Sequence, residues 1–222
     1  MRSVYIHIPF CKSICSYCDF CKFLYNTAWA DKYLEVLEQE INSFYDNDLI
    51  NTIYIGGGTP TSLNFNQLIK LFNIIKLFKT TDDLEFTMEC NINDITEELL
   101  SLLKNNGVNR LSIGVQSLDY YKIKFLNRKH NKKMVQNNVQ LIKKYGFNFN
   151  LDFMYATPIE TYHMFKNDIN EFLKLDPDHI STYSLIIEDN TMLKLNDIKP
   201  ISQELDSSMY EYICKKIKEK RI

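Results

Sequence analysis

Glycine, proline and tryptophan are scarce in this chain. Its 222 residues include six glycines, five prolines and one tryptophan, which excludes collagen-like and low-complexity proteins. No run of about 18 apolar residues occurs, so no membrane-spanning helix is expected. The net charge of −2 provides no dedicated basic face, and nucleic acid is not expected as a partner. The N-terminal MRSVYIHIPF lacks the layout of a secretion signal, so we expect a cytoplasmic protein.

Cysteine, in contrast, is well represented, with six residues in a chain whose hydrophobic fraction of 45% is typical of globular proteins. Thiols stay reduced in the cytoplasm. The cysteines therefore indicate metal binding or catalysis before disulfides.

Strand-like and helix-like segments alternate along the chain, and this alternation predicts an α/β fold with a parallel sheet. Thr96 is the expected N-cap of one helix, and Gly107 is the residue expected just beyond its C-terminus. Strands are expected at 3–8, 52–55, 84–89, 109–115, 148–154 and 179–186. Helices are expected at 28–45, 64–78, 97–105, 119–126, 131–145, 162–174 and 203–220.

Three cysteines follow the first expected strand with the spacing C-x3-C-x2-C. Thiolates of Cys11, Cys15 and Cys18 can surround one face of a compact metal cluster and leave one metal position without a protein ligand. An open position suits a site that binds substrate, whereas structural sites use four protein ligands. A structural zinc module remains an alternative, although zinc loops usually add a second cysteine pair elsewhere.

Polar or flexible residues mark the expected strand ends, where ligand sites of α/β barrels are built. Gly56, Gly57 and Gly58 follow the second strand and would let a ligand approach exposed backbone N–H groups. The other strand ends carry Glu89, Gln116, Asp152 and Ser184. Each of these residues alone reads equally well as a cap or turn residue.

The segment YIHIPFCKSICSYCDF resembles the signature of the radical S-adenosylmethionine (SAM) superfamily, in its oxygen-independent coproporphyrinogen III oxidase branch. The later segments GGGTP, NRLSIGVQSLD, FLNRKH, NLDFMYATP and ISTYSLIIEDNT resemble further blocks of that branch. The resemblance implies a partial (βα)6 radical SAM barrel with parallel strands. It also implies a [4Fe–4S] cluster on the three cysteines, whose fourth iron binds SAM, and reductive cleavage of SAM to methionine and a 5′-deoxyadenosyl radical.

The resemblance also assigns binding residues by position, and it assigns no catalytic residue. Tyr5, Gly57 and Glu89 match contacts to the cluster-bound SAM. A second SAM is bound in the oxidases, and the matching positions here are Tyr17, Gly58, Thr59, Gln116, Arg128, Asp152 and Ile186. Arg128, in NRKHNKK, also reads as a solvated basic residue.

Position 20 separates two subgroups of this branch. The oxidases carry a cysteine two residues after the third ligand, whereas this chain has Phe20, and its YCDF resembles the heme-chaperone (HemW-like) subgroup. We therefore expect a heme chaperone, with the oxidase of porphyrin biosynthesis as the alternative and no conversion of coproporphyrinogen III. Heme or a porphyrinogen, and an electron donor such as flavodoxin or ferredoxin, are the expected partners. Cys21, Cys90 and Cys214 are not expected to be ligands.

Relatives in this branch continue beyond the barrel, so we expect residues 1–200 to form the radical SAM core. Residues 201–222 would then begin a truncated C-terminal region. The histidines show no metal-ligand spacing. His7 is expected on the face of the first strand, and His130, His163 and His179 are expected at the surface or in turns.

Overall fold

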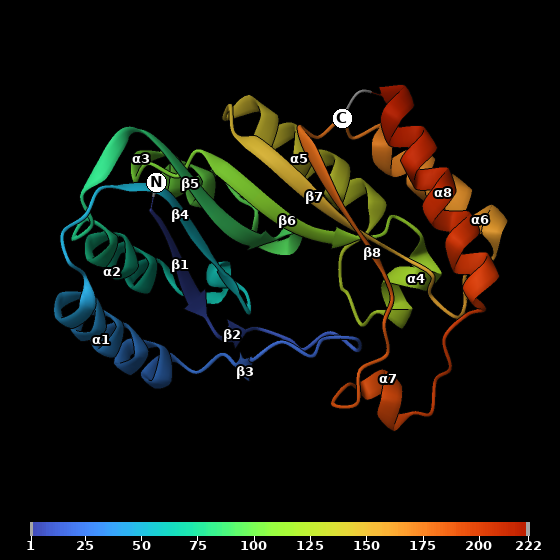
Figure 1. Ribbon diagram of the computed structural model, residues 1–222, viewed down its shortest axis with the longest axis horizontal. Helices are drawn as coiled ribbons and strands as arrows, with labels where there is room; N and C mark the ends of the chain where they lie inside the picture. The colour runs from blue at the N-terminus through green and yellow to red at the C-terminus, as the bar shows by residue number, and fades with distance from the viewer. Residues whose placement is uncertain (1, 221–222) are drawn as a thin grey trace. The chain divides into compact units, whose positions relative to one another are not determined.

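The computed structural model describes residues 2–220 as an α/β fold with a six-stranded sheet (Figure 1). The strand order is β1-β4-β5-β6-β7-β8, and the pairs β1/β4, β4/β5 and β7/β8 are parallel. Their bounds are Ser3–Ile8 for β1, Ile50–Gly57 for β4, Thr80–Asn91 for β5, Arg110–Gln116 for β6, Asn148–Tyr155 for β7 and His179–Ser184 for β8. These parallel pairs confirm the prediction of an α/β fold with a parallel sheet.

The chain divides into two compact units. The first runs up to Ser13 and resumes over Phe20–Leu111, and the second contains Ile14–Asp19 and the chain from Ser112 onward. Strand β6 therefore starts in the first unit and ends in the second.

In the first unit, two helices lie side by side (Figure 1). Asn26 caps α1 (Thr27–Phe44), and Asn64 forms a capping box with Gln67 at the start of α2 (Phe65–Ile75). Apolar residues at helical spacing bury one face of each helix, including Leu34 and Leu71, which have no exposed surface. The unit also holds the short strands β2 (Phe10–Cys11) and β3 (Phe23–Leu24), the 3-10 turns η1 (Pro60–Ser62) and η2 (Ile92–Asp94), and α3 (Glu97–Asn105).

In the second unit, α8 (Gln203–Lys220) packs beside α6 (Tyr162–Leu173) (Figure 1). Asn170 of α6 donates to the Tyr212 hydroxyl at 3.1 Å, and Lys220 donates to the Leu173 carbonyl at 2.8 Å. The remaining helices of this unit are α4 (Tyr120–Phe125), α5 (Lys132–Lys144) and α7 (Met192–Leu195). Over residues 2–220 no helix is long and apolar enough to cross a membrane.

The predicted elements agree with the observed ones to within a few residues. The strand at 3–8 and the helices at 97–105 and 203–220 have the predicted bounds, and Thr96 caps α3 by accepting from the Leu99 amide at 3.1 Å. The strand expected at 84–89 is longer at both ends, and the one expected at 179–186 ends at Ser184. The predicted division into residues 1–200 and 201–222 stays a prediction.

Candidate functional site

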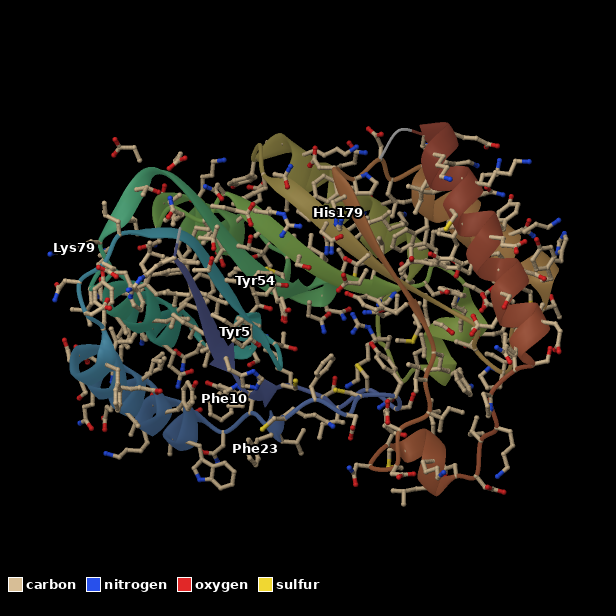
Figure 2. The ribbon with its side chains drawn as sticks, in the orientation of Figure 1. Tyr5, Phe10, Phe23, Tyr54, Lys79 and His179 are labelled. Carbon is tan, nitrogen blue, oxygen red and sulfur yellow. The ribbon has the colours of Figure 1, made fainter. Side chains whose placement is uncertain are left out.

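The base of the cysteine loop is fixed within the first unit. Strand β2 pairs in parallel with β3, so that Phe10 is opposite Phe23 (Figure 2). The Phe23 amide donates to the Pro9 carbonyl at 2.6 Å, and the Tyr25 amide donates to the Cys11 carbonyl at 2.9 Å. These bonds hold the two ends of the loop together on each side of residues 12–20.

His7 adds a third connection at the base of the loop. Its Nε2 lies 2.9 Å from the Cys21 carbonyl, which can only accept, so Nε2 carries the proton. Its Nδ1 therefore accepts from the Tyr5 hydroxyl, 3.0 Å away. The prediction that His7 lies on β1 is confirmed, and Cys21 contributes its backbone carbonyl to this contact.

Cys11 is buried beside the turn that follows β4. Its Sγ lies 3.5 Å from Thr59 Oγ1, and the Thr59 amide donates to the Phe10 carbonyl at 2.8 Å. The Gly58 amide donates to the Ile8 carbonyl at 2.9 Å. The turn that carries Gly58 and Thr59 is thus bonded directly to the strand that carries Cys11.

At each of the three glycines of this turn, an added Cβ would collide with another group of the protein. A Cβ at Gly56 would lie 2.7 Å from the Glu89 carboxyl group, and one at Gly58 would lie 2.9 Å from the Ile8 carbonyl oxygen. Gly57 has a φ of +112°, which favours glycine, and a Cβ there would collide with the His7 ring. The expectation that the N–H groups are open to a ligand is wrong for residues 57, 58 and 59, because each donates within the protein.

Glu89 holds this turn through both carboxylate oxygens. Tyr54 Oη donates to Oε1 at 2.8 Å, and the Gly57 amide donates to Oε2 at 2.9 Å. Burial raises the pKa of Glu89, and the two hydrogen bonds oppose that shift. Tyr5 and Tyr54 come from the neighbouring strands β1 and β4, with ring centroids 6.0 Å apart (Figure 2). The structure therefore brings together the predicted first-SAM residues Tyr5, Gly57 and Glu89 in one unit.

Cys15, Tyr17 and Cys18 belong to the second unit. The Cys18 amide donates to the Cys15 carbonyl at 3.3 Å, which gives this segment a turn. Tyr17 packs against the apolar cluster of Leu126, Met154, Leu185 and Leu193. Burial raises the pKa of Tyr17, so its hydroxyl stays protonated at neutral pH.

Arg128 is not a solvated residue. One guanidinium nitrogen donates to the Gly114 carbonyl, and Nη1 lies 3.6 Å from Cys15 Sγ. Its Nε is buried and has no hydrogen-bond partner. Arg128 is therefore half-buried, with its guanidinium next to the thiol of a predicted cluster ligand.

The other second-SAM residues differ in their surroundings. Gln116 ends β6 with a φ of +73°, and its buried Oε1 has no hydrogen-bond partner. Asp152 lies within β7, and its Oδ1 accepts from Asn150 Nδ2 at 2.8 Å. Ile186 lies beyond the end of β8 and is 67% exposed. Gln116 and Arg128 flank Gly114, because a Cβ on this glycine would lie 3.4 Å from a nitrogen of each.

The donor chemistry of the loop fits an iron–sulfur cluster. Within residues 2–220 none of the six cysteines forms a disulfide, and Cys15 and Cys18 are partly exposed while Cys21 is exposed. Over residues 2–220 no group of three or more His, Cys, Asp and Glu side chains is gathered in a metal-binding arrangement. The assignment to Cys11, Cys15 and Cys18 therefore depends on their spacing and thiol chemistry. Burial raises the pKa of Cys90, which fits its predicted packing role.

Two buried features were missed by the sequence analysis. His130, expected at the surface or in a turn, is only 4% exposed, and its Nε2 lies 3.1 Å from the Ser117 carbonyl. Lys122, Glu160 and Asp168 form ion pairs with almost no exposed surface. No local sequence pattern marks these residues as buried, because their burial depends on contacts with distant segments.

Comparison with known proteins identifies the family. The sequence model of the radical SAM superfamily matches residues 5–172. The chain is similar to the heme chaperone HemW of Lactococcus lactis (40% identity, 96% of this chain, 57% of the relative) and of Bacillus subtilis (41%, 98% and 60%). The structure of the coproporphyrinogen III oxidase HemN of Escherichia coli, a radical SAM enzyme, superposes with a TM-score of 0.90 at 27% identity, covering 98% of this chain and 52% of that one.

The chain thus spans less than two thirds of the length of these relatives. The family match nonetheless covers the cysteine loop, the glycine turn and the strands from Tyr5 of β1 to the end of β7. Family membership implies a [4Fe–4S] cluster and SAM. The chain belongs to the radical SAM superfamily.

Proposed function

We propose that this chain acts in heme metabolism as a HemW-like heme chaperone. The observation that carries the proposal is the 40% and 41% identity to two proteins named heme chaperone HemW, over nearly all of this chain. Phe20, at the position where the oxidases have a cysteine, favours the same subgroup. Heme is then the cargo, and an electron donor such as flavodoxin or ferredoxin supplies electrons.

Most of the predicted site residues have a role in this proposal. Cys11, Cys15 and Cys18 hold the cluster, and the chemistry that the reduced cluster and SAM supply when bound is one-electron cleavage of SAM. The SAM amino group needs an acceptor, which backbone carbonyls of the Gly57 turn can provide. Glu89 fixes that turn through its bond from the Gly57 amide. By resemblance to the oxidases, the second set would contact a second SAM, and it consists of Tyr17, Gly58, Thr59, Gln116, Arg128, Asp152 and Ile186.

Oxygen-independent oxidation of coproporphyrinogen III is the alternative function. It is favoured by the TM-score of 0.90 to the Escherichia coli HemN structure. Phe20 opposes it, since the oxidase pattern has a cysteine there. A structural zinc module is the second alternative, and it would use the same thiols.

Metal content tests the cluster assignment. Anaerobic reconstitution should give about four irons and four sulfides per chain. Replacing Cys11, Cys15 or Cys18 by Ala should abolish the cluster, and replacing Cys21, Cys90 or Cys214 by Ala should preserve it. Cluster loss in Cys21→Ala would refute the three-ligand assignment. Purification with one zinc and no uptake of iron would support the zinc module instead.

Product analysis separates the chaperone from the oxidase. The reduced, cluster-loaded protein is incubated anaerobically with SAM and coproporphyrinogen III, and hemin is titrated in a parallel sample. We expect 5′-deoxyadenosine and methionine without protoporphyrinogen, together with a saturable heme absorption band. Stoichiometric formation of protoporphyrinogen IX would establish the oxidase. Absence of heme binding with SAM cleavage intact would refute the chaperone role of this chain.

A further inference from the structure

Three charged side chains are buried together in the second unit, and we call them the buried triad: Lys122, Glu160 and Asp168. Lys122 Nζ lies 2.6 Å from Glu160 Oε1 and 3.0 Å from Asp168 Oδ2. The exposed fractions of the three side chains are 1%, 0% and 1%. Burial of charges is costly even when they are paired, so an ion cluster without solvent contact needs a reason beyond stability.

Asp168 connects the triad to the end of β6. Its Oδ2 accepts from Ser117 Oγ at 2.5 Å, and its Oδ1 accepts from the Leu118 amide at 2.8 Å. Ser117 and Leu118 directly follow Gln116, the last residue of β6. The carboxylate therefore fixes the backbone immediately after the predicted ligand residue Gln116.

Glu160 connects the triad to the end of β7 in a similar way. Its Oε2 lies 3.3 Å from the Thr157 amide and 3.4 Å from the Thr157 hydroxyl, and both groups donate. Thr157 follows Ala156, which comes directly after the last residue of β7. Lys122 bonds to both carboxylates and so connects the ends of two strands that are neighbours in the sheet.

The backbone at these two strand ends is strained. Within residues 2–220, six non-glycine residues have a positive φ, and four of them are Asn or Asp, which tolerate this conformation. The other two are Gln116 (φ 73°) and Ala156 (φ 63°). Such strain persists only where surrounding contacts hold it, and it gathers at functional sites. Both strained residues are followed directly by a residue that the triad holds.

We propose that Lys122, Glu160 and Asp168 are positioning residues that hold the ends of β6 and β7 in the geometry needed to bind SAM. The inference rests on the proposed function, in which Gln116 belongs to the set of residues that contacts a second SAM. Gln116 provides the link to the ligand, because its buried Oε1 lacks a partner and can accept from a donor group of SAM. The triad acts through Gln116 and the adjoining backbone.

The main test neutralises the triad without emptying the space it fills. The variant K122M/E160Q/D168N removes all three charges together, because a single substitution would leave unpaired buried charge and destabilise the fold. The control is Ile142→Ala, which opens a cavity on α5 within the same unit, where Ile142 is fully buried. Iron content, melting temperature, SAM affinity by calorimetry and amide hydrogen exchange are measured for both variants and the wild type.

We expect the triple variant to retain its iron and to bind SAM about tenfold more weakly, a loss typical of residues that orient ligand contacts. Amide exchange should accelerate at Leu118 and Thr157. The control should have a lower melting temperature, whereas its SAM affinity and the exchange rates at Leu118 and Thr157 should be unchanged. Wild-type SAM affinity and wild-type exchange in a folded triple variant would overturn the proposal.

Two further measurements keep the proposal testable if the triple variant does not fold or the wild type does not bind SAM. Ser117→Ala removes only the hydroxyl that donates to Asp168. Unchanged SAM affinity in this variant would refute the positioning role of the buried triad. A wild type that holds its cluster and fails to bind SAM would refute the proposed function instead. In that event, the positioning role of the buried triad is decided by hydrogen exchange at Leu118 and Thr157 in the triple variant and the Ile142→Ala control. This measurement requires no ligand.

Discussion

Buried His130 should make the protein less stable in mild acid. Its Nε2 donates to the Ser117 carbonyl at 3.1 Å, so in the neutral ring Nδ1 carries no proton. That Nδ1 is buried without a hydrogen-bond partner. Burial lowers the pKa of His130 to about 4, a shift that Arg128 increases and that the Ser117 carbonyl and Asp168 oppose. The folded protein therefore resists a proton that the unfolded chain accepts.

The size of the effect follows from the two pKa values. The unfolded state binds the proton below its pKa of 6.5, and the folded state binds it only near 4. Stability is therefore lost as pH falls through this window, because the unfolded state holds more protons. Between pH 7 and pH 5 the loss attributable to His130 amounts to about 2 kcal/mol.

The assay compares His130→Gln with the wild type in urea unfolding at pH 7 and pH 5. Gln can still donate to the Ser117 carbonyl and does not titrate, so the variant should gain about 2 kcal/mol relative to the wild type on acidification. Effects of other acidic groups are shared and cancel in the difference. His163→Gln, at an exposed position of α6, serves as the control and should show no such gain. A constant difference between wild type and His130→Gln at the two pH values would refute the buried neutral ring.

Four other substitutions test the site and the fold. Gly57→Ala should lower the free energy of unfolding by about 1–3 kcal/mol because of its positive φ and the His7 ring, whereas Gly114→Ala, whose Cβ meets its neighbours only at 3.4 Å, should be milder in thermal denaturation. Relative to the wild type, Glu89→Gln should be more stable at pH 7 than at pH 4. The raised pKa of Glu89 makes its contribution to the free energy of unfolding largest at acid pH, and the opposite trend in urea unfolding would contradict this. Thr96→Ala should cost about 1 kcal/mol through loss of the α3 cap, measured by the same method, and no loss would show that the cap is unimportant.

The sequence predicted the sheet because strands and helices depend on local patterns. The candidate site, which stays a prediction, was located by local motifs of the same kind. Alternating apolar segments fix strands and helices, and Thr96 and Gly107 mark the two ends of α3 through capping. Glycines 56–58 marked a strand end for a sound reason, that a Cβ does not fit there. The groups that exclude the Cβ atoms are Glu89, His7 and the backbone of β1 and β2, and these long-range contacts could not be read from the sequence.

The buried polar groups could not be predicted, because their burial arises from tertiary packing. Lys122 lies between Tyr121 and Ile123 in a short helix and resembles any surface lysine in sequence. His130 follows two basic residues, which suggested exposure. Glutamine rarely adopts a positive φ, so the conformation of Gln116 could not be predicted from its residue type. It depends on the tertiary contacts of Ser117 and Leu118, the two residues that follow.

The base of the cysteine loop is held closed by hydrogen bonds that do not involve a cofactor. Closure is already enforced by the bonds from Phe23 and Tyr25 and by His7, and the entropy of a closed loop changes only logarithmically with its length. One residue inserted between Ser13 and Ile14 would cost about 0.1 kcal/mol in loop closure. The same insertion would change the interval between Cys11 and Cys15. Loop-closure entropy therefore places little limit on the length of this loop, whereas the proposed cluster would constrain the interval between its cysteines.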